Sequence, residues 1–269
     1  MILFLLVISI LMYRNWQSSP VTGKVEGEKT QAAKLVTFAL VADVEGDNAN
    51  LAKALTQAKS GGAEFVVGLG DLTQYGSLAE LQVVKNVFER SGMRYYVLPG
   101  DHDYPASRDA GLEANAYFRQ VFGEPYQEFS LNGTQFILIA NADIYTGIDD
   151  AQWFWLSNIL KANPPTVRIV LAHKTPWHPT SANKVMGAET PAVADQAKQL
   201  DALLSENKVN HLFVGDTHFF ADFPNSTDSY KITTIGAVIE ERSIMEPRFA
   251  IVNVYADGTI EVNDTVIAN

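Results

Sequence analysis

The chain has 269 residues with 20 Lys and Arg against 31 Asp and Glu, a formal net charge of −11, and 47% hydrophobic residues. This balance excludes collagen-like, coiled-coil and disordered chains, and the scarcity of basic clusters argues against a nucleic-acid partner. The absence of cysteine excludes disulfides, thiolate metal sites and a cysteine nucleophile. Any metal ion must therefore bind to His, Asp, Glu or Asn.

The N-terminal segment is uniformly apolar. Met1–Tyr13 contains no charged side chain, and Arg14 follows it. As a helix this segment would extend about 20 Å, less than the roughly 30 Å hydrocarbon core of a membrane. We expect residues 1–16 to be a hydrophobic membrane anchor or, alternatively, a signal segment whose cleavage would give a secreted protein. Residues 17–33 are expected to be a flexible tether, and residues 34–269 a catalytic domain outside the cytoplasm.

Short apolar runs alternate with amphipathic segments from residue 34 onward, a pattern typical of an α/β domain. The predicted strands are 35–42, 65–69, 95–98, 136–140, 167–172, 211–214, 230–235, 249–255 and 259–262. The predicted helices are 50–59, 78–89, 113–122, 151–160 and 192–205. The last two strands are expected to form a hairpin around Asp257 and Gly258.

Polar residues follow five of these strands. Four of them are aspartates: Asp43, Asp71, Asp101 and Asp216. A fifth strand is followed by His173, and His102 and His218 stand beside the aspartates. Each Asp taken singly is a common helix cap or turn residue. The carboxyl ends of strands meet at one edge of an α/β sheet, however, and carboxylates gathered there require a cation.

These segments resemble the five sequence blocks of the calcineurin-like metallophosphoesterase superfamily. The family blocks read Asp-x-His, Gly-Asp, Gly-Asn-His-Asp, His and Gly-His-x-His. This chain has, in the same order, Asp43-Val44-Glu45, Gly70-Asp71, Gly100-Asp101-His102-Asp103, His173 and Gly215-Asp216-Thr217-His218. The resemblance covers residues 35–262 and implies a four-layer α/β/β/α sandwich with two mixed β-sheets. Glu45, Asp101 and Asp216 depart from the usual His, Asn and His.

The resemblance also implies a role for each of these residues. Asp71 would bridge two metal ions, one completed by Asp43, Glu45 and His218, the other by Asp101, His173 and Asp216. His102 would stay outside the metal shells, stabilise the phosphoryl oxygens and protonate the leaving oxygen. Asp103 would orient His102 by accepting a hydrogen bond from its other ring nitrogen.

The three departures all place carboxylates where neutral ligands are usual. Oxygen ligands suit harder ions, so we expect manganese or iron, with Mg²⁺, Ca²⁺ or Zn²⁺ as alternatives. Surplus negative charge repels a phosphate dianion, which favours a phosphodiester over a monoester. The expected substrate is a small-molecule, lipid or nucleotide phosphoester, with Tyr104, Trp177 and His178 as candidate contacts.

A second interpretation keeps the same scaffold without strong catalysis. A membrane-tethered module that binds a metal or another ligand would need the same residues and little turnover. The three replacements argue against a site that has lost its metal, because Glu45, Asp101 and Asp216 are each able to bind a metal ion. One further histidine, His211, stands at the start of a strand, and we expect it at the surface or in a cap.

Overall fold

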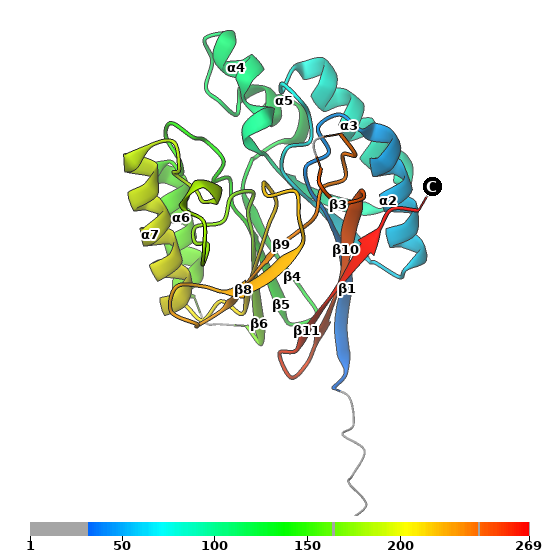
Figure 1. The fold of residues 1–269 in the computed structure, drawn as a ribbon. Coiled ribbons are helices and arrows are strands. Elements are labelled where there is room, and N and C mark those ends of the chain that lie inside the picture. The colour runs from blue at the N-terminus through cyan, green and yellow to red at the C-terminus, as the bar shows by residue number, and fades with distance from the viewer. Residues whose placement is uncertain (1–31, 163–164, 242, 269) are drawn as a thin grey trace, which may run out of the picture. The chain divides into compact units, whose positions relative to one another are not determined.

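The computed structural model describes residues 32–162, 165–241 and 243–268, in which two β-sheets lie between helices (Figure 1). The predicted anchor, residues 1–16, and nearly all of the tether fall outside the described residues. No helix of the described part is both long and apolar enough to cross a membrane.

The first sheet combines three parallel strands with an antiparallel hairpin. Its strands are β1 (Lys34–Val41), β2 (Phe65–Leu69), β3 (Arg94–Leu98), β10 (Arg248–Tyr255) and β11 (Ile260–Val266). Their order is β11-β10-β1-β2-β3, with β1, β2 and β3 parallel and β10 antiparallel to both neighbours. The predicted hairpin of the last two strands is thereby confirmed.

The second sheet is also mixed. Its strands are β4 (Gln127–Leu131), β5 (Thr134–Leu138), β6 (Val167–Leu171), β7 (His211–Val214), β8 (Ala221–Pro224) and β9 (Lys231–Thr234). Their order is β4-β5-β6-β7-β9-β8, parallel from β5 to β9 and antiparallel at both edges. The sequence did not reveal the edge strands β4 and β8, because an exposed edge needs no continuous apolar run.

The two sheets pack face to face through a buried aromatic core. Phe38 and Phe65 come from the first sheet, and Phe136 and Phe213 from the second. The ring centroid of Phe38 lies 5.2 Å from that of Phe136 in an edge-to-face contact. Side chains of alternate strand residues point to this shared layer, so each sheet has a second apolar face to cover.

Helices cover the outer face of each sheet. The helices on the first sheet are α2 (Asn48–Ser60), α3 (Leu78–Ser91) and α5 (Ala116–Phe122), and the short α4 (Pro105–Asp109) precedes α5. On the second sheet lie α6 (Asp150–Lys161) and α7 (Pro191–Glu206) (Figure 1). Short 3₁₀ turns occupy Asp101–Asp103 and Ala182–Lys184. The four-layer α/β/β/α sandwich expected from the sequence is confirmed.

One predicted helix begins later than expected. The helix predicted at 113–122 starts at Ala116, and the carbonyl of Glu113 accepts from the Ala116 N–H in a turn before it. By contrast, α3 begins where its sequence signal lies. The Ser77 hydroxyl accepts from the Glu80 N–H and the Glu80 carboxylate accepts from the Ser77 N–H. This capping box anchors the loop that runs from the end of β2 to α3.

Candidate metal centre

The carboxyl ends of five parallel strands bring the predicted ligands together. Asp43, Asp71 and Asp101 follow β1, β2 and β3 of the first sheet within two or three residues. His173 and Asp216 follow β6 and β7 of the second sheet at the same distance along the chain. Because the two sheets pack face to face, these ends meet at one rim of the sandwich. The rim therefore collects residues that are up to 173 positions apart, as the hydrogen bond from Asp216 N to Asp43 Oδ1 (3.0 Å) shows.

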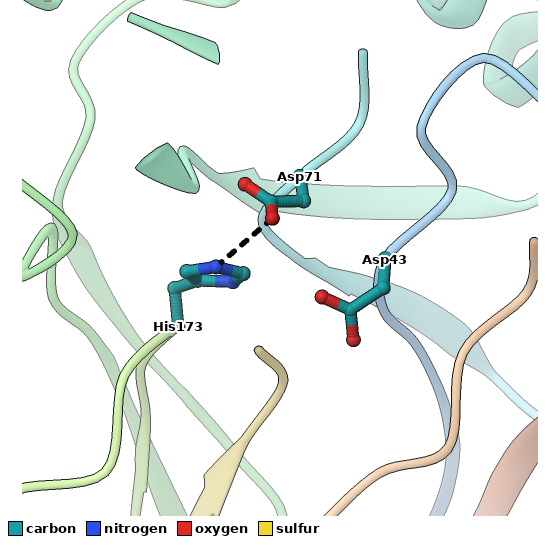
Figure 2. A group of neighbouring side chains, drawn as sticks. All are labelled: Asp43, Asp71 and His173. Atoms are coloured by element: carbon teal, nitrogen blue, oxygen red, sulfur yellow. Dashed lines mark ion pairs between the residues drawn. The ribbon is translucent and has the colours of Figure 1, made fainter. Parts of the chain in front are cut away.

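His173 lies at the centre of the cluster. Its Nε2 is 3.3 Å from Asp71 Oδ2, 3.2 Å from Asp101 Oδ1 and 3.7 Å from Asp216 Oδ1. Figure 2 shows the imidazole directed at Asp71, with the carboxylate of Asp43 beside them. The potential ligand atoms of Asp43, Asp71 and His173 lie within 4.8 Å of one another, as do those of Asp101, His173 and Asp216.

A third group of the same compactness extends the cluster. The potential ligand atoms of Glu45, Asp71 and His102 also lie within 4.8 Å of one another. His218 reaches this side of the cluster, with its Nε2 3.2 Å from Glu45 Oε1 and 3.8 Å from Asp43 Oδ1. All seven residues predicted as metal ligands therefore lie in one continuous cluster, with His102 at its margin.

The backbone at the cluster adopts a costly conformation. Eight non-glycine residues of the described part have a positive φ, and five of these are cluster residues. They are Asp43 (52°), Glu45 (42°), Asp71 (48°), Asp216 (65°) and His218 (58°). Such a conformation costs about 1–3 kcal/mol per residue and concentrates at functional sites. The strand ends thus hold these side chains in directions that ordinary turns would not give.

The buried polar atoms of the cluster fit a bound cation. His173 donates from Nδ1 to the Leu69 carbonyl at 2.8 Å, which holds the ring with Nε2 facing the carboxylates. His173 Nε2 and Asp43 Oδ2 are buried without a hydrogen-bond partner. Buried polar atoms rarely lack a partner in folded proteins. A divalent ion is a group that would bind a carboxylate oxygen and an imidazole nitrogen together.

The charges within the cluster are strongly coupled. Complete burial raises the pKa of Asp43 to about 7, and the charge of Asp71 adds to this rise against the opposing effect of His173. The hydrogen bond with Glu45 raises the pKa of His218. Burial alone would lower the pKa of His173, but the carboxylates of Asp71, Asp101 and Asp216 together outweigh it and raise the pKa well above its usual value. A bound cation would take over this neutralising role and keep the carboxylates ionised.

Asp103 has a different role from the one expected. Its fully buried carboxylate does not orient His102 but accepts four hydrogen bonds from other groups. Oδ1 accepts from the N–H and hydroxyl of Thr73, and Oδ2 from the N–H groups of Leu72 and Gly100. Asp103 therefore joins the loops after β2 and β3, and burial raises its pKa to about 6.

His102 is held by a backbone carbonyl instead. Its Nδ1 lies 3.1 Å from the Gln74 carbonyl oxygen. Because a carbonyl can only accept, Nδ1 carries a proton, and Nε2 is the ring atom left for another partner. Its backbone N–H donates to Asp71 Oδ1 at 2.9 Å. Burial alone would lower the pKa of His102, but the charge of Asp71 and the bond to Gln74 raise it overall.

Lys174 is a member of the cluster that the sequence reasoning missed. Its Nζ is 2.6 Å from Asp216 Oδ1 and 3.1 Å from Asp101 Oδ1, and its side chain is 8% exposed. Burial alone would lower the pKa of Lys174, but the charges of Asp216 and Asp101 raise it overall. The available signal was its position directly after His173, which places it at the same strand end.

The three candidate substrate contacts lie in different surroundings. Tyr104 is buried, with its ring 5.3 Å from the Arg108 guanidinium carbon. Trp177 is 37% exposed, and its carbonyl accepts from the hydroxyl of Thr175. The ring of His178 packs 5.0 Å from that of Phe223. None of the three lines the cavity of about 810 Å³ that opens beside Glu45 and Gln74.

His211, expected at the surface, is buried. It is 4% exposed, its ring stacks on Phe213 at 4.2 Å, and its Nε2 lies 2.6 Å from Thr233 Oγ1. The Thr233 hydroxyl donates to Asp222, so it accepts from His211 Nε2–H. His211 begins a central strand, which is covered on both faces, and the local sequence does not reveal that the strand is central.

Comparisons with known proteins agree with this geometry. A family model described as calcineurin-like phosphoesterase matches residues 36–220. No curated protein sequence matches the chain. The structure of purple acid phosphatase PPD1 from yellow lupin (Lupinus luteus) is similar, with a TM-score of 0.65 and 12% identity over 88% of this chain and 52% of that one. This chain thus spans about half of the lupin protein.

Two further structures share the fold. The protein described as GAP50, the anchor in the inner membrane complex of Plasmodium, has a TM-score of 0.57 and 15% identity over 88% of this chain and 90% of that one. A putative 5′-nucleotidase from Staphylococcus aureus has a TM-score of 0.54 and 12% identity over 87% of this chain and 54% of that one. At these identities the similarity establishes the fold alone.

Proposed function

Because this chain belongs to the calcineurin-like phosphoesterase family, we propose that it hydrolyses phosphoric esters with the help of two metal ions and prefers phosphodiesters. One observation supports this above all others. Five carboxylates and two imidazoles from five strand ends meet in one cluster, and the buried Asp43 Oδ2 and His173 Nε2 have no hydrogen-bond partner among the described residues.

In this proposal the cluster would supply two groups of ligands that share Asp71. Asp43, Glu45 and His218 would hold one ion with it. Asp101, His173 and Asp216 would hold the other. When bound, such ions lower the pKa of water and polarise a phosphoryl group. The predominance of oxygen ligands favours manganese or iron.

His102 would act as the general acid. Its Nδ1–H is held by the Gln74 carbonyl, so the ring cannot rotate freely and Nε2 is the atom that can deliver a proton. One ring nitrogen lies within 4.8 Å of carboxylate oxygens of Glu45 and Asp71, at the margin of the cluster. A proton given from this position to the departing oxygen would prevent the release of an unstable alkoxide.

The surroundings of the cluster favour a phosphodiester. A monoester dianion would meet more repulsion from the five carboxylates than a diester monoanion, even with Lys174 offsetting part of their charge. The cavity beside Glu45 offers Leu72, Val83 and Ile239 as apolar lining, with acidic groups among its other residues. An uncharged or cationic alcohol group of a small-molecule, lipid or nucleotide diester would suit this cavity.

The test compares two chromogenic esters. The protein is freed of metal, reloaded separately with Mn²⁺, Fe²⁺, Zn²⁺, Mg²⁺ or Ca²⁺, and assayed with bis(p-nitrophenyl) phosphate and p-nitrophenyl phosphate. We expect faster turnover of the diester with Mn²⁺ or Fe²⁺. His102→Ala should keep its metal content and lose about 10²–10⁴-fold in turnover. The matched control is Asp195→Asn, at an exposed residue of α7, which should behave as the wild type.

Metal binding without hydrolysis of either ester would favour the second candidate function. This is a membrane-tethered module of the same fold that binds metal or another ligand. The description of GAP50 as an anchor supports the idea that a protein of this fold can serve as an anchor. Absence of metal binding would refute the hydrolytic function and would leave, of the second candidate function, only the binding of another ligand.

We also propose attachment to a membrane through residues 1–16, with the catalytic domain outside the cytoplasm. The support is the uniformly apolar Met1–Tyr13. The full chain expressed with a C-terminal tag should sediment with membranes and be accessible to protease added from outside the cell. A soluble chain with an intact N-terminus would contradict the anchor.

A further inference from the structure

The half of the cluster formed by Asp101, His173 and Asp216 already contains a cation. The Lys174 ammonium lies 2.6 Å from Asp216 Oδ1 and 3.1 Å from Asp101 Oδ1. These are the same two oxygens that approach His173 Nε2 at 3.7 and 3.2 Å. A metal ion bound to this triad would compete with the ammonium for both carboxylates.

The position of Lys174 is built into the fold. Asn141, which is fully buried after β5, accepts from the backbone N–H groups of both His173 and Lys174 at 3.1 Å through its side-chain oxygen. Its amide donates to the Lys174 carbonyl at 2.6 Å. One side chain therefore fixes the backbone from which both the imidazole and the ammonium reach the cluster.

Lys174 also accounts for two of the unusual carboxylates. The family pattern has Asn and His at the positions of Asp101 and Asp216, and both departures here lie within ion-pair distance of the ammonium. A buried lysine needs such partners, because an isolated buried charge is costly. The two carboxylates and the lysine thus form one electrostatic unit.

We propose that Lys174 acts as an internal counterion that weakens metal binding in the Asp101–Asp216 half, so that an ion enters this half only by displacing the ammonium. This inference rests on the proposed function, since it concerns the same metal centre. Because the metal ion must first break the buried ion pairs of Lys174, we expect its binding in this half to be weakened on the order of 100-fold. Lys174 would then set how many ions the protein holds at a given metal concentration.

The test measures the binding of Mn²⁺ alone to the metal-free full chain by calorimetry, with metal content checked by elemental analysis. Lys174→Met keeps the length of the side chain and removes its charge. We expect the affinity for one Mn²⁺ ion to rise on the order of 100-fold and that for the other to stay unchanged. In Lys174→Met combined with Asp216→Asn this gain should disappear, which assigns it to the Asp101–Asp216 half.

Two variants act as controls. Lys198→Met removes an exposed lysine that pairs with Asp195 on α7, and it should bind Mn²⁺ as the wild type does. Lys174→Gln provides the same loss of charge should Lys174→Met fail to fold, as circular dichroism would show. If the wild type binds Mn²⁺ and hydrolyses phosphoesters, but the folded Lys174 variant binds Mn²⁺ with unchanged affinities, this inference alone is overturned. A wild type that binds no Mn²⁺ would overturn the proposed function together with it.

Discussion

Gly70 is the position where a single methyl group should disturb the metal centre most directly. Its φ is +90°, and a Cβ added there would lie 2.6 Å from His173 Nδ1 and 2.7 Å from the backbone nitrogen of Gly100. His173 Nδ1 is the atom that donates to the Leu69 carbonyl and so aims Nε2 at the carboxylates. Gly70→Ala should therefore act on metal binding through the orientation of His173.

The structure gives the size of the effect. To reach an ordinary 3.4 Å contact, the His173 ring must retreat by about 0.8 Å, which stretches its 2.8 Å hydrogen bond to Leu69. Loss of such a supporting bond typically lowers metal affinity by about 10–100-fold. The positive φ adds about 1–2 kcal/mol of destabilisation and the steric clash about 1–3 kcal/mol more.

The matched control is Gly62→Ala. Gly62 has a φ of +83°, and an added Cβ would meet nothing within 4 Å. It should lose only the conformational contribution of about 1–2 kcal/mol in urea-induced unfolding and bind Mn²⁺ as the wild type does. The proposed effect on His173 would be refuted if Gly70→Ala bound Mn²⁺ as tightly as the wild type, or if Gly70→Ala and Gly62→Ala lost Mn²⁺ affinity equally.

Three further changes test other parts of the centre and the fold. Asp71→Asn removes the negative charge and one carboxylate oxygen of the shared ligand, so metal content after dialysis should fall, and full occupancy by elemental analysis would count against a bridging role. Glu45→His combined with Asp101→Asn and Asp216→His removes three carboxylates, so in metal competition the preference should shift from Mn²⁺ toward Zn²⁺; an unshifted preference would place these side chains outside the metal shells. Burial lowers the pKa of His211 to about 3, so below pH 6.5 the unfolded chain binds a proton that the folded chain excludes. His211 should therefore lower the free energy of unfolding by about 1.4 kcal/mol per pH unit on acidification toward pH 4, a contribution that urea titrations of His211→Gln should lack; identical slopes of the two proteins would contradict it.

The sequence by itself determined the layered α/β architecture and the identity of the main cluster. Strands such as β2 and β6 are short apolar runs ended by turn residues, and helices such as α6 show their apolar period locally. Asp71 and His173 could be identified because each follows a parallel strand, and the carboxyl ends of parallel strands meet at one edge of a sheet. The order of the blocks along the chain then linked these positions to one family.

Only the tertiary structure decided how the side chains of the cluster are partnered. Asp103 binds N–H groups 30 and 31 positions away as well as the nearby Gly100, so its part in joining two loops could not be read from its neighbour His102. Lys174 meets Asp216 across 42 positions, and nothing in the local sequence distinguishes it from a solvated lysine. Hydrogen bonds and ion pairs of this kind depend on the register and packing of two sheets, whereas strand ends depend on a few consecutive residues.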